Sequence, residues 1–178
     1  MHQKSQLGIY CIPTTSATPP KFATPGSACF DICACLHTET VQAYYGSTVQ
    51  EGISKTVILH LHHPAYILIP PNHRALIPTG LILDIREGFS VRLHARSGLA
   101  VKYGIVLSNG EGIIDHDYTH ELIIAVTNNN DVGDFKIEDG MRICQAELVE
   151  CCATQIVQVH SPPERNTTRV GGFGSTGT

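Results

Sequence analysis

"TVILHLHHPAYILIPPNHRALIPTGLILDIREGFSVRLHA", residues 56–95, decides the fold class of this chain. It contains short apolar runs rich in β-branched residues, and prolines, glycines and an asparagine separate them. Several runs alternate apolar and polar residues, as half-buried strands do. The breaks "IPPNH" and "IPTG" are typical of turns, because proline fixes φ and glycine or asparagine accepts unusual backbone angles. Many short strands with frequent turns predict an all-β sandwich or barrel.

The same pattern continues on both sides of this stretch. Further strands are expected at residues 8–12, 29–35, 104–108, 121–128, 142–150 and 154–160. A long amphipathic helix is not indicated anywhere. One short helix is expected from Ser97 to about Tyr103, since serine is a good N-cap and Gly104 a good stop.

The chain is expected to form one domain followed by a tail. Residues 1–160 are predicted to hold the β domain, with Thr38–Pro64 interpreted as an inserted hairpin. Residues 161–178 are predicted to be a linker and a glycine-rich C-terminal lid. Ordering each backbone costs about 1–2 kcal/mol, and the tail "RVGGFGSTGT" has one large apolar side chain, Phe173, to offset that cost. Such a tail orders only when a ligand supplies contacts, and a disordered terminus is the alternative.

Composition and charge exclude several classes of protein. The chain has 178 residues, enough for one domain with a moderate core. Its net charge of −4 argues against a nucleic-acid partner, because binding to phosphate backbones favours a basic surface. An apolar run of 18 residues is missing, which argues against a membrane span. Residues 1–13 also lack the apolar stretch of a secretory signal.

The seven cysteines are an odd number without a disulfide-like framework. With no export signal, we interpret them as reduced thiols and expect a cytoplasmic location, or the nucleus or a host cell for a eukaryotic or viral source. An exported protein with paired cysteines is the alternative. Cys29, Cys33 and Cys35 lack the paired C-x2-C units of a zinc site, so they are interpreted as small buried hydrophobes, as are Cys151 and Cys152.

Two stretches carry residues suited to a nucleotide. In "ARSGLAVKYGI", residues 95–105, Arg96 offers a planar fork for phosphate oxygens and the helix start at Ser97 offers free N–H groups. A capped turn without a ligand is the alternative. In "VLSNGEGIIDHDY", residues 106–118, Asn109-Gly110 and Gly112 predict a tight β-hairpin. The backbone at its bend and the Asn109 amide can read the flat edge of a nucleobase.

Two carboxylates lie in unusual surroundings. Asp115 follows Ile113 and Ile114, so we expect it to be poorly solvated and suited to general-base work, the alternative being that it simply ends a strand. Asp31, in "PGSACFDICAC" at residues 25–35, lies within an apolar strand and needs a cation or a hydrogen-bond donor beside it.

A further pair of donors lies in "GMRICQAEL", residues 140–148. Arg142 and Gln145 can both donate to oxyanions, but in a straight strand residues three apart face opposite ways, so at most one is an easy contact unless the chain bends. The tail adds Arg169 and Ser175 as donors. Phosphate donors, a base-reading turn, a metal-binding acid and a candidate base together indicate hydrolysis of a nucleoside triphosphate.

The order and spacing of these stretches resemble the trimeric dUTP diphosphatases, or dUTPases. Five family motifs have counterparts in the same order, namely "PGSACFDICA", "RSGLAVKYGI", "NGEGIIDHDYTHEL", "GMRICQ" and "RVGGFGSTG". The resemblance implies a β-clip, a distorted jelly-roll barrel with one short helix, assembled as a homotrimer with shared active sites. It also implies an enzyme that hydrolyses dUTP to dUMP and pyrophosphate with Mg²⁺, limiting uracil incorporation into DNA and supplying dUMP for thymidylate synthesis.

The resemblance further implies a role for each matched residue. Asp115 would be the catalytic base that activates a water for attack on the α-phosphorus, and Asp31 would hold Mg²⁺ through its water shell. The substrate-binding residues would be Arg96, Ser97, Gly98, Arg142 and Gln145 for the phosphates, Asn109, Gly112, Ile113 and Ile114 for uracil, and Tyr118 for the deoxyribose. From the tail, Phe173 would stack on uracil, and Arg169, Gly174 and Ser175 would close over the phosphates.

The chain departs from the family pattern at His120, where glycine is usual, and in the spacing of Arg169, which is one residue closer to the following glycines. Two other functions are compatible with the same fold. A dCTP deaminase, or a bifunctional deaminase–dUTPase, resembles R-S-S rather than Arg96-Ser97-Gly98 and lacks the pairing in "IIDHDY". A non-catalytic regulatory protein would be expected to have lost the base or the lid.

Overall fold

The computed structural model describes residues 5–45, 55–62 and 65–164. In chain order the elements are β1 Gly8–Cys11, β2 Phe30–Cys33, β3 Thr40–Tyr45, β4 Lys55–His60, β5 Tyr66–Ile69, β6 His73–Pro78, β7 Leu81–Asp84, β8 Phe89–Ala95, α1 Ser97–Tyr103, β9 Ile105–Leu107, β10 Gly112–Ile114, β11 Ile123–Asn128, β12 Phe135–Glu138 and β13 Arg142–Glu150. The prediction of an all-β chain with one short helix is therefore confirmed over the described residues.

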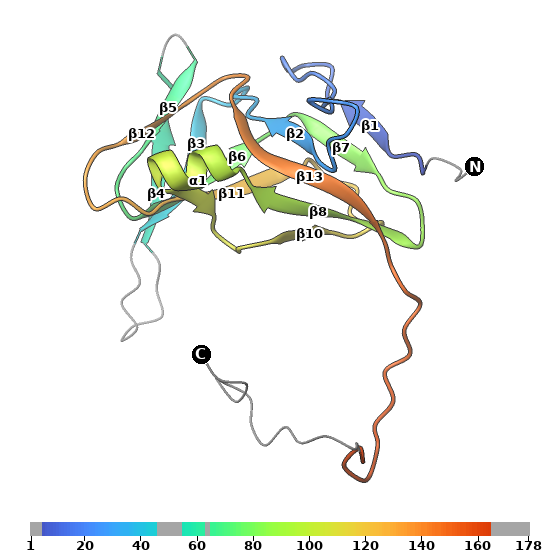
Figure 1. The fold of residues 1–178 in the computed structure, drawn as a ribbon. Coiled ribbons are helices and arrows are strands. Elements are labelled where there is room, and N and C mark those ends of the chain that lie inside the picture. The colour runs from blue at the N-terminus through green and yellow to red at the C-terminus, as the bar shows by residue number, and fades with distance from the viewer. Residues whose placement is uncertain (1–4, 46–54, 63–64, 165–178) are drawn as a thin grey trace.

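The strands pair in four antiparallel groups (Figure 1). One sheet has the order β10-β8-β13-β2, and a second has the order β4-β3-β6-β11-β9. Two ribbons, β1-β7 and β12-β5, complete the domain. The segment Thr38–Pro64 supplies β3 and β4, which pair with each other, and β3 also pairs with β6.

The apolar runs that predict the strands also build the core. Strand β5 alternates as expected, with Ile67 and Ile69 fully buried. Ile77 of β6 and Ile124 of β11 are buried opposite each other in the register of their sheet. Each fully buried side chain of this size stabilises the fold by about 1.5–3 kcal/mol. No helix among the described residues has the length and apolar character needed to cross a membrane.

Helix α1 spans the predicted residues, but its start differs from the expectation. Arg96 is the N-cap, with extended backbone angles and no side-chain cap bond, and Ser97 is the first helical residue. The Arg96 guanidinium cannot cap because it has no acceptor, and it bonds elsewhere in the site. Gly104 ends the helix as predicted, in the left-handed conformation with φ 64°. Leu99 anchors the helix in the core.

The strand expected at residues 154–160 does not form. The chain leaves β13 as an extended segment that lies away from the body of the domain (Figure 1). Its side chains are exposed, including Ile156, Val157 and Val159. The apolar alternation of the segment is real, but a strand needs a hydrogen-bonded neighbour, and the described part of the chain offers none here.

Candidate active site

The centre of the candidate site is the Asp31 carboxylate on β2. Its Oδ1 accepts a hydrogen bond from Arg96 Nε at 3.0 Å, and its Oδ2 accepts one from Arg142 Nη1 at 3.0 Å. Arg96 Nη1 also donates to the main-chain oxygen of Arg142 at 3.1 Å. The Asp31 side chain is 18% exposed, so this acid has the cationic partners that its apolar strand requires. Two guanidinium groups on one carboxylate leave an excess positive charge.

A β-bulge brings Arg142 and Gln145 to the same face. Arg142 lies opposite Cys33 and Gln145 lies opposite Asp31, with a register shift between Arg142 and Cys144. Because Asp31 and Cys33 are two residues apart on β2, they share a face, and so do their partners on β13. In a straight strand these two donors would face opposite ways. Because the strand is bent at the bulge, both donors face the same way.

These residues line one cleft of about 480 Å³. Its wall is formed by Ala23, Ser27, Ala28, Cys29, Asp31, Arg96, Ser97, Gly98, Arg142 and Gln145. A Cβ added at Gly98 would meet nothing within 4 Å, so the space beside the start of the helix is open. The first, second and fourth motifs of the sequence thus meet at one cleft within a single chain.

The third motif forms a turn that is not a paired hairpin. Gly110 has φ 73°, and its N–H donates to the Leu107 oxygen at 3.1 Å, so the turn itself forms. However, β9 pairs with β11 and β10 pairs with β8, in two different sheets. The hairpin prediction is wrong in this respect because tertiary pairing draws the two strands apart. Each strand lies at the edge of its sheet, where one side of the backbone lacks a partner strand among the described residues.

The candidate base lies outside the cleft. None of the residues from Asn109 to Tyr118 lines it. The expectation that Asp115 is poorly solvated is also wrong for the isolated chain, where Asp115 is exposed. Its apolar neighbours do not cover it, since Ile113 is itself exposed and Ile114 is half-buried on the other side of β10.

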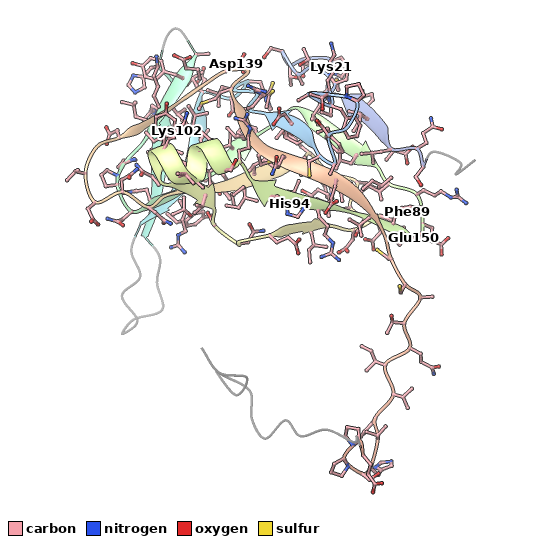
Figure 2. The ribbon with its side chains drawn as sticks, in the orientation of Figure 1. Lys21, Phe89, His94, Lys102, Asp139 and Glu150 are labelled. Carbon is pink, nitrogen blue, oxygen red and sulfur yellow. The ribbon has the colours of Figure 1, made fainter. Side chains whose placement is uncertain are left out.

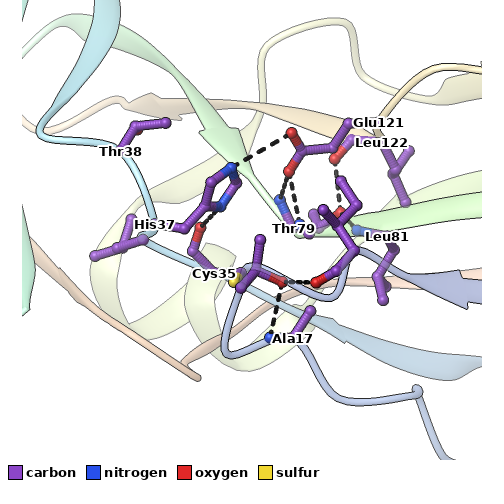
Figure 3. Close-up of polar contacts among 12 residues, drawn as sticks. Ala17, Cys35, His37, Thr38, Thr79, Leu81, Glu121 and Leu122 are labelled. Carbon is purple, nitrogen blue, oxygen red and sulfur yellow. Dashed lines mark hydrogen bonds and ion pairs between the residues drawn. The ribbon is translucent and has the colours of Figure 1, made fainter.

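The loop after Asp115 is anchored by a residue that sequence reasoning did not single out. Glu121 Oε1 accepts hydrogen bonds from the main-chain N–H of Gly80 at 2.6 Å and of Thr79 at 3.2 Å, and its Oε2 lies 3.7 Å from His37 Nε2 (Figure 3). The Tyr118 hydroxyl donates to the main-chain oxygen of Glu121 at 2.9 Å. The turn that Glu121 binds is distant in sequence, so no local pattern points to this contact.

His120 and the tail complete the list of predicted positions. The His120 ring meets the Tyr118 ring edge-on at 5.8 Å. Arg169, Phe173, Gly174 and Ser175, together with the rest of the predicted lid, lie outside the described residues.

The cysteines are free thiols, as expected, but they are not all buried. Burial raises the pKa of the Cys144 thiol to about 12, with the Asp31 carboxylate adding to the effect, so this residue acts as a small neutral hydrophobe. Burial likewise raises the pKa of Cys33. Cys151 and Cys152 are exposed, contrary to the expectation.

Comparison with known proteins supports the reading of the motifs. The family profile described as dUTPase matches residues 44–177. A deoxyuridine 5'-triphosphate nucleotidohydrolase of Chlamydia muridarum is 33% identical over 173 residues, covering 96% of this chain and 99% of the relative. One of Brucella melitensis is 44% identical over 112 residues, covering 63% of this chain and 70% of the relative.

The solved structures agree with the predicted architecture. The dUTPase of Staphylococcus bacteriophage 80alpha, solved with dUPNHPP, superposes with a TM-score of 0.74 at 20% identity, covering 98% of this chain and 100% of that chain. A mutant dUTPase of S. aureus phage phi11, described with a structural Mg(II) ion, superposes with a TM-score of 0.65 at 19% identity, covering 88% and 98%. The likeness confirms the distorted jelly-roll fold. Because its profile and a nearly full-length relative both match, the chain belongs to the dUTPase family.

Proposed function

We propose that this chain hydrolyses dUTP to dUMP and pyrophosphate, with Asp115 activating the attacking water. One observation carries the proposal: three motifs of a dUTPase meet at a cleft that holds two arginines and one carboxylate. A triphosphate carries several negative charges, and planar guanidinium groups bind phosphate oxygens in a fork geometry. The excess positive charge around Asp31 suits such a ligand.

The phosphate-binding residues we propose are Arg96, Ser97, Gly98, Arg142 and Gln145. The two arginines already lie side by side on Asp31, so they are held in place before a nucleotide arrives. Gln145 adds an amide; its Nε2 lies 3.4 Å from the Ala95 oxygen, a weak contact that a phosphate can replace. The open space at Gly98 allows close approach to the backbone.

We propose that Asp31 holds Mg²⁺ through the water shell of the ion. The carboxylate has about four lone-pair sites, and the two arginines use one on each oxygen, so acceptor capacity remains for metal-bound waters. Mg²⁺ keeps several waters and prefers oxygen ligands, which fits this residue. Bound there, the ion would offset charge on the phosphates and the leaving pyrophosphate.

We propose that uracil binds between the separated strands of the third motif. The backbone of Gly112, Ile113 and Ile114 lies on an edge strand, with β8 on its other side. Such an edge can pair with a flat base as it would with another strand, and the Asn109 amide adds a donor and an acceptor. Tyr118, fixed by its bond to Glu121, would pack on the deoxyribose and exclude a 2′-hydroxyl.

We propose a homotrimer in which each site is shared. Asp115 is exposed and outside the cleft of its own chain, so a complete site needs it to meet the cleft of another copy. The segment after β13 exposes Ile156, Val157 and Val159, which an assembled neighbour would cover. The tail residues Arg169, Phe173, Gly174 and Ser175 would come from a third copy and close over the nucleotide.

The test is a pyrophosphate-release assay with dUTP, dTTP, dCTP and UTP, each with and without Mg²⁺. Of the four nucleotides, we expect only dUTP to be turned over. We expect most of that turnover to be lost when Mg²⁺ is left out. Ammonia release from dCTP would instead support a deaminase. Tight binding of nucleotide without any product would support a regulatory protein on this fold.

A further inference from the structure

A second group of side chains that could bind a metal lies at and beside the cleft wall. Cys29 stands just before β2, His94 lies on β8 (Figure 2) and Glu147 lies on β13, the strand between them. Gln145 is opposite both Asp31 and His94, so these three residues form one row across the sheet. Glu147 lies two residues further along β13, and Cys29 two residues before Asp31. The three side chains therefore share the face that carries the cleft.

The ligand atoms of the three side chains are close enough for one ion. The Cys29 Sγ, a His94 ring nitrogen and a Glu147 carboxylate oxygen all lie within 4.8 Å of one another. His94 Nε2 and Glu147 Oε1 are 3.1 Å apart. Zinc bonds of about 2.0–2.3 Å at tetrahedral angles place ligand atoms about 3.2–3.8 Å apart. The widest pair needs to close by only about 1 Å, within the reach of rotamer changes at half-buried positions.

A carboxylate also lies near the second ring nitrogen of His94. Its other ring nitrogen, Nδ1, lies 3.8 Å from Glu111 Oε1, and Glu111 in turn pairs with Arg92 at 3.4 Å. Histidines that bind a metal usually donate their free ring N–H to a carboxylate or carbonyl oxygen, which fixes the tautomer and the orientation of the ring. Glu111 could accept that bond if the two groups closed from 3.8 Å to the hydrogen-bond range of about 2.7–3.2 Å, with Nε2 facing the ion.

We propose that Cys29, His94 and Glu147 form a Zn²⁺ site, distinct from the proposed magnesium site at Asp31. One thiolate, one imidazole and one carboxylate are a donor set that suits zinc and not Mg²⁺, which takes oxygen ligands. Zinc displaces the Cys29 proton to solvent on binding, and a water fills the fourth position.

The competing arrangement uses no metal. A protonated His94 can form a simple ion pair with Glu147, and Cys29 would then be a bystander. The two arrangements differ in what they require: the ion pair needs neither the thiol nor Glu111, whereas the metal site needs the thiol and is tuned by Glu111. A variant series across the four residues therefore separates them.

The experiment uses the full-length chain, reduced and stripped with chelator. Zn²⁺ affinity is measured by competition with a chromophoric chelator, and Co²⁺ serves as a spectroscopic substitute. We expect a single zinc per chain with a tetrahedral Co²⁺ spectrum and a thiolate charge-transfer band. Cys29→Ser should remove that band. Cys29→Ser, His94→Asn and Glu147→Gln should each weaken zinc by more than about 100-fold, and Glu111→Gln by about 10-fold.

Cys152→Ser is the matched control, because it removes an exposed thiol that is not one of the three proposed ligands and should leave zinc affinity unchanged. Circular dichroism checks that each variant is folded, and the half-buried His94 and Glu147 variants keep the test valid if Cys29→Ser is unstable. Zinc affinity that is unchanged by His94→Asn and Glu147→Gln would overturn the proposal. A Co²⁺ complex without a thiolate band would overturn it as well, in favour of the ion pair.

Discussion

Replacing Asp115 by Asn is expected to separate an effect on catalysis from an effect on stability, if Asp115 is the proposed base. The Asp115 side chain is exposed and makes no hydrogen bond or ion pair with any described residue, so the free energy of unfolding should change by less than about 0.5 kcal/mol. Loss of a general base lowers turnover by about 10²–10⁴-fold. That loss corresponds to about 3–5 kcal/mol of activation free energy. The effect on the rate should thus exceed the effect on stability several-fold.

Pyrophosphate release from dUTP with Mg²⁺ measures turnover, urea unfolding measures stability, and titration with the non-hydrolysable dUPNHPP measures binding. Asp117→Asn, an exposed acid in the same loop, is the matched control and should keep the wild-type rate. A turnover of Asp115→Asn within about tenfold of the wild type would refute its role as the base. A large loss of stability would show instead that the carboxylate has a structural partner.

Three further outcomes are expected. Deleting residues 166–178 should abolish most turnover and leave the unfolding transition unchanged, as checked by circular dichroism; normal turnover would exclude a lid. Asn128→Leu should lower the free energy of unfolding in urea by about 1–3 kcal/mol per orphaned carbonyl, because the buried Asn128 amide donates to the oxygens of Ile69 at 2.9 Å and Gly133 at 3.2 Å. Burial raises the pKa of Cys144 from 9.0 to about 12, so the folded chain holds this proton more tightly and its contribution to stability is lost as the pH rises from 9.0 to about 12. The stability difference between wild type and Cys144→Ala should therefore shift in favour of the variant over that range, and parallel pH profiles would contradict this.

Local signals in the sequence predict the elements well where one residue type decides the backbone. Helix α1 spans Ser97–Tyr103 as expected, because Gly104 accepts the left-handed conformation that ends it. The apolar runs of residues 56–95 became strands for a similar reason, since their alternation buries one face. The end of a helix and the alternation of a strand both depend on residues that are neighbours in the sequence, so they can be predicted from it.

The sequence pattern does not show which residues distant in the chain will become neighbours in the fold. The turn at Gly110 is visible in "NGEG", but the separation of β9 from β10 depends on β11 and β8. The bulge that brings Arg142 and Gln145 together is set by the register with β2. Likewise, the sequence alone favours Cys29 as a small buried hydrophobe, because His94 and Glu147 come near it only through the pairing of three strands.

The position of Asp115 is the main reason to propose that a single chain does not form a complete active site. Its exposure does not suit a base, yet the cleft of the same chain lacks any other candidate from the third motif. Both facts are reconciled if the cleft, the base and the tail of one site come from three different copies. In that arrangement, a chain without its base and a chain without its tail can complement each other in a mixed trimer.

Asp115→Asn and the chain lacking residues 166–178 should each lose most of their turnover alone, and mixing them after denaturation and refolding should restore activity. Each mixed trimer would hold one complete site, with Asp115 from the truncated chain and the tail from the substituted chain. Random mixing of equal amounts should therefore return about a quarter of the wild-type rate in a closed ring of three subunits. Sites built within one chain would always lack either the base or the tail. Failure to recover any activity, with mixed trimers verified by mass, would thus rule out the shared site while leaving the family and the fold intact.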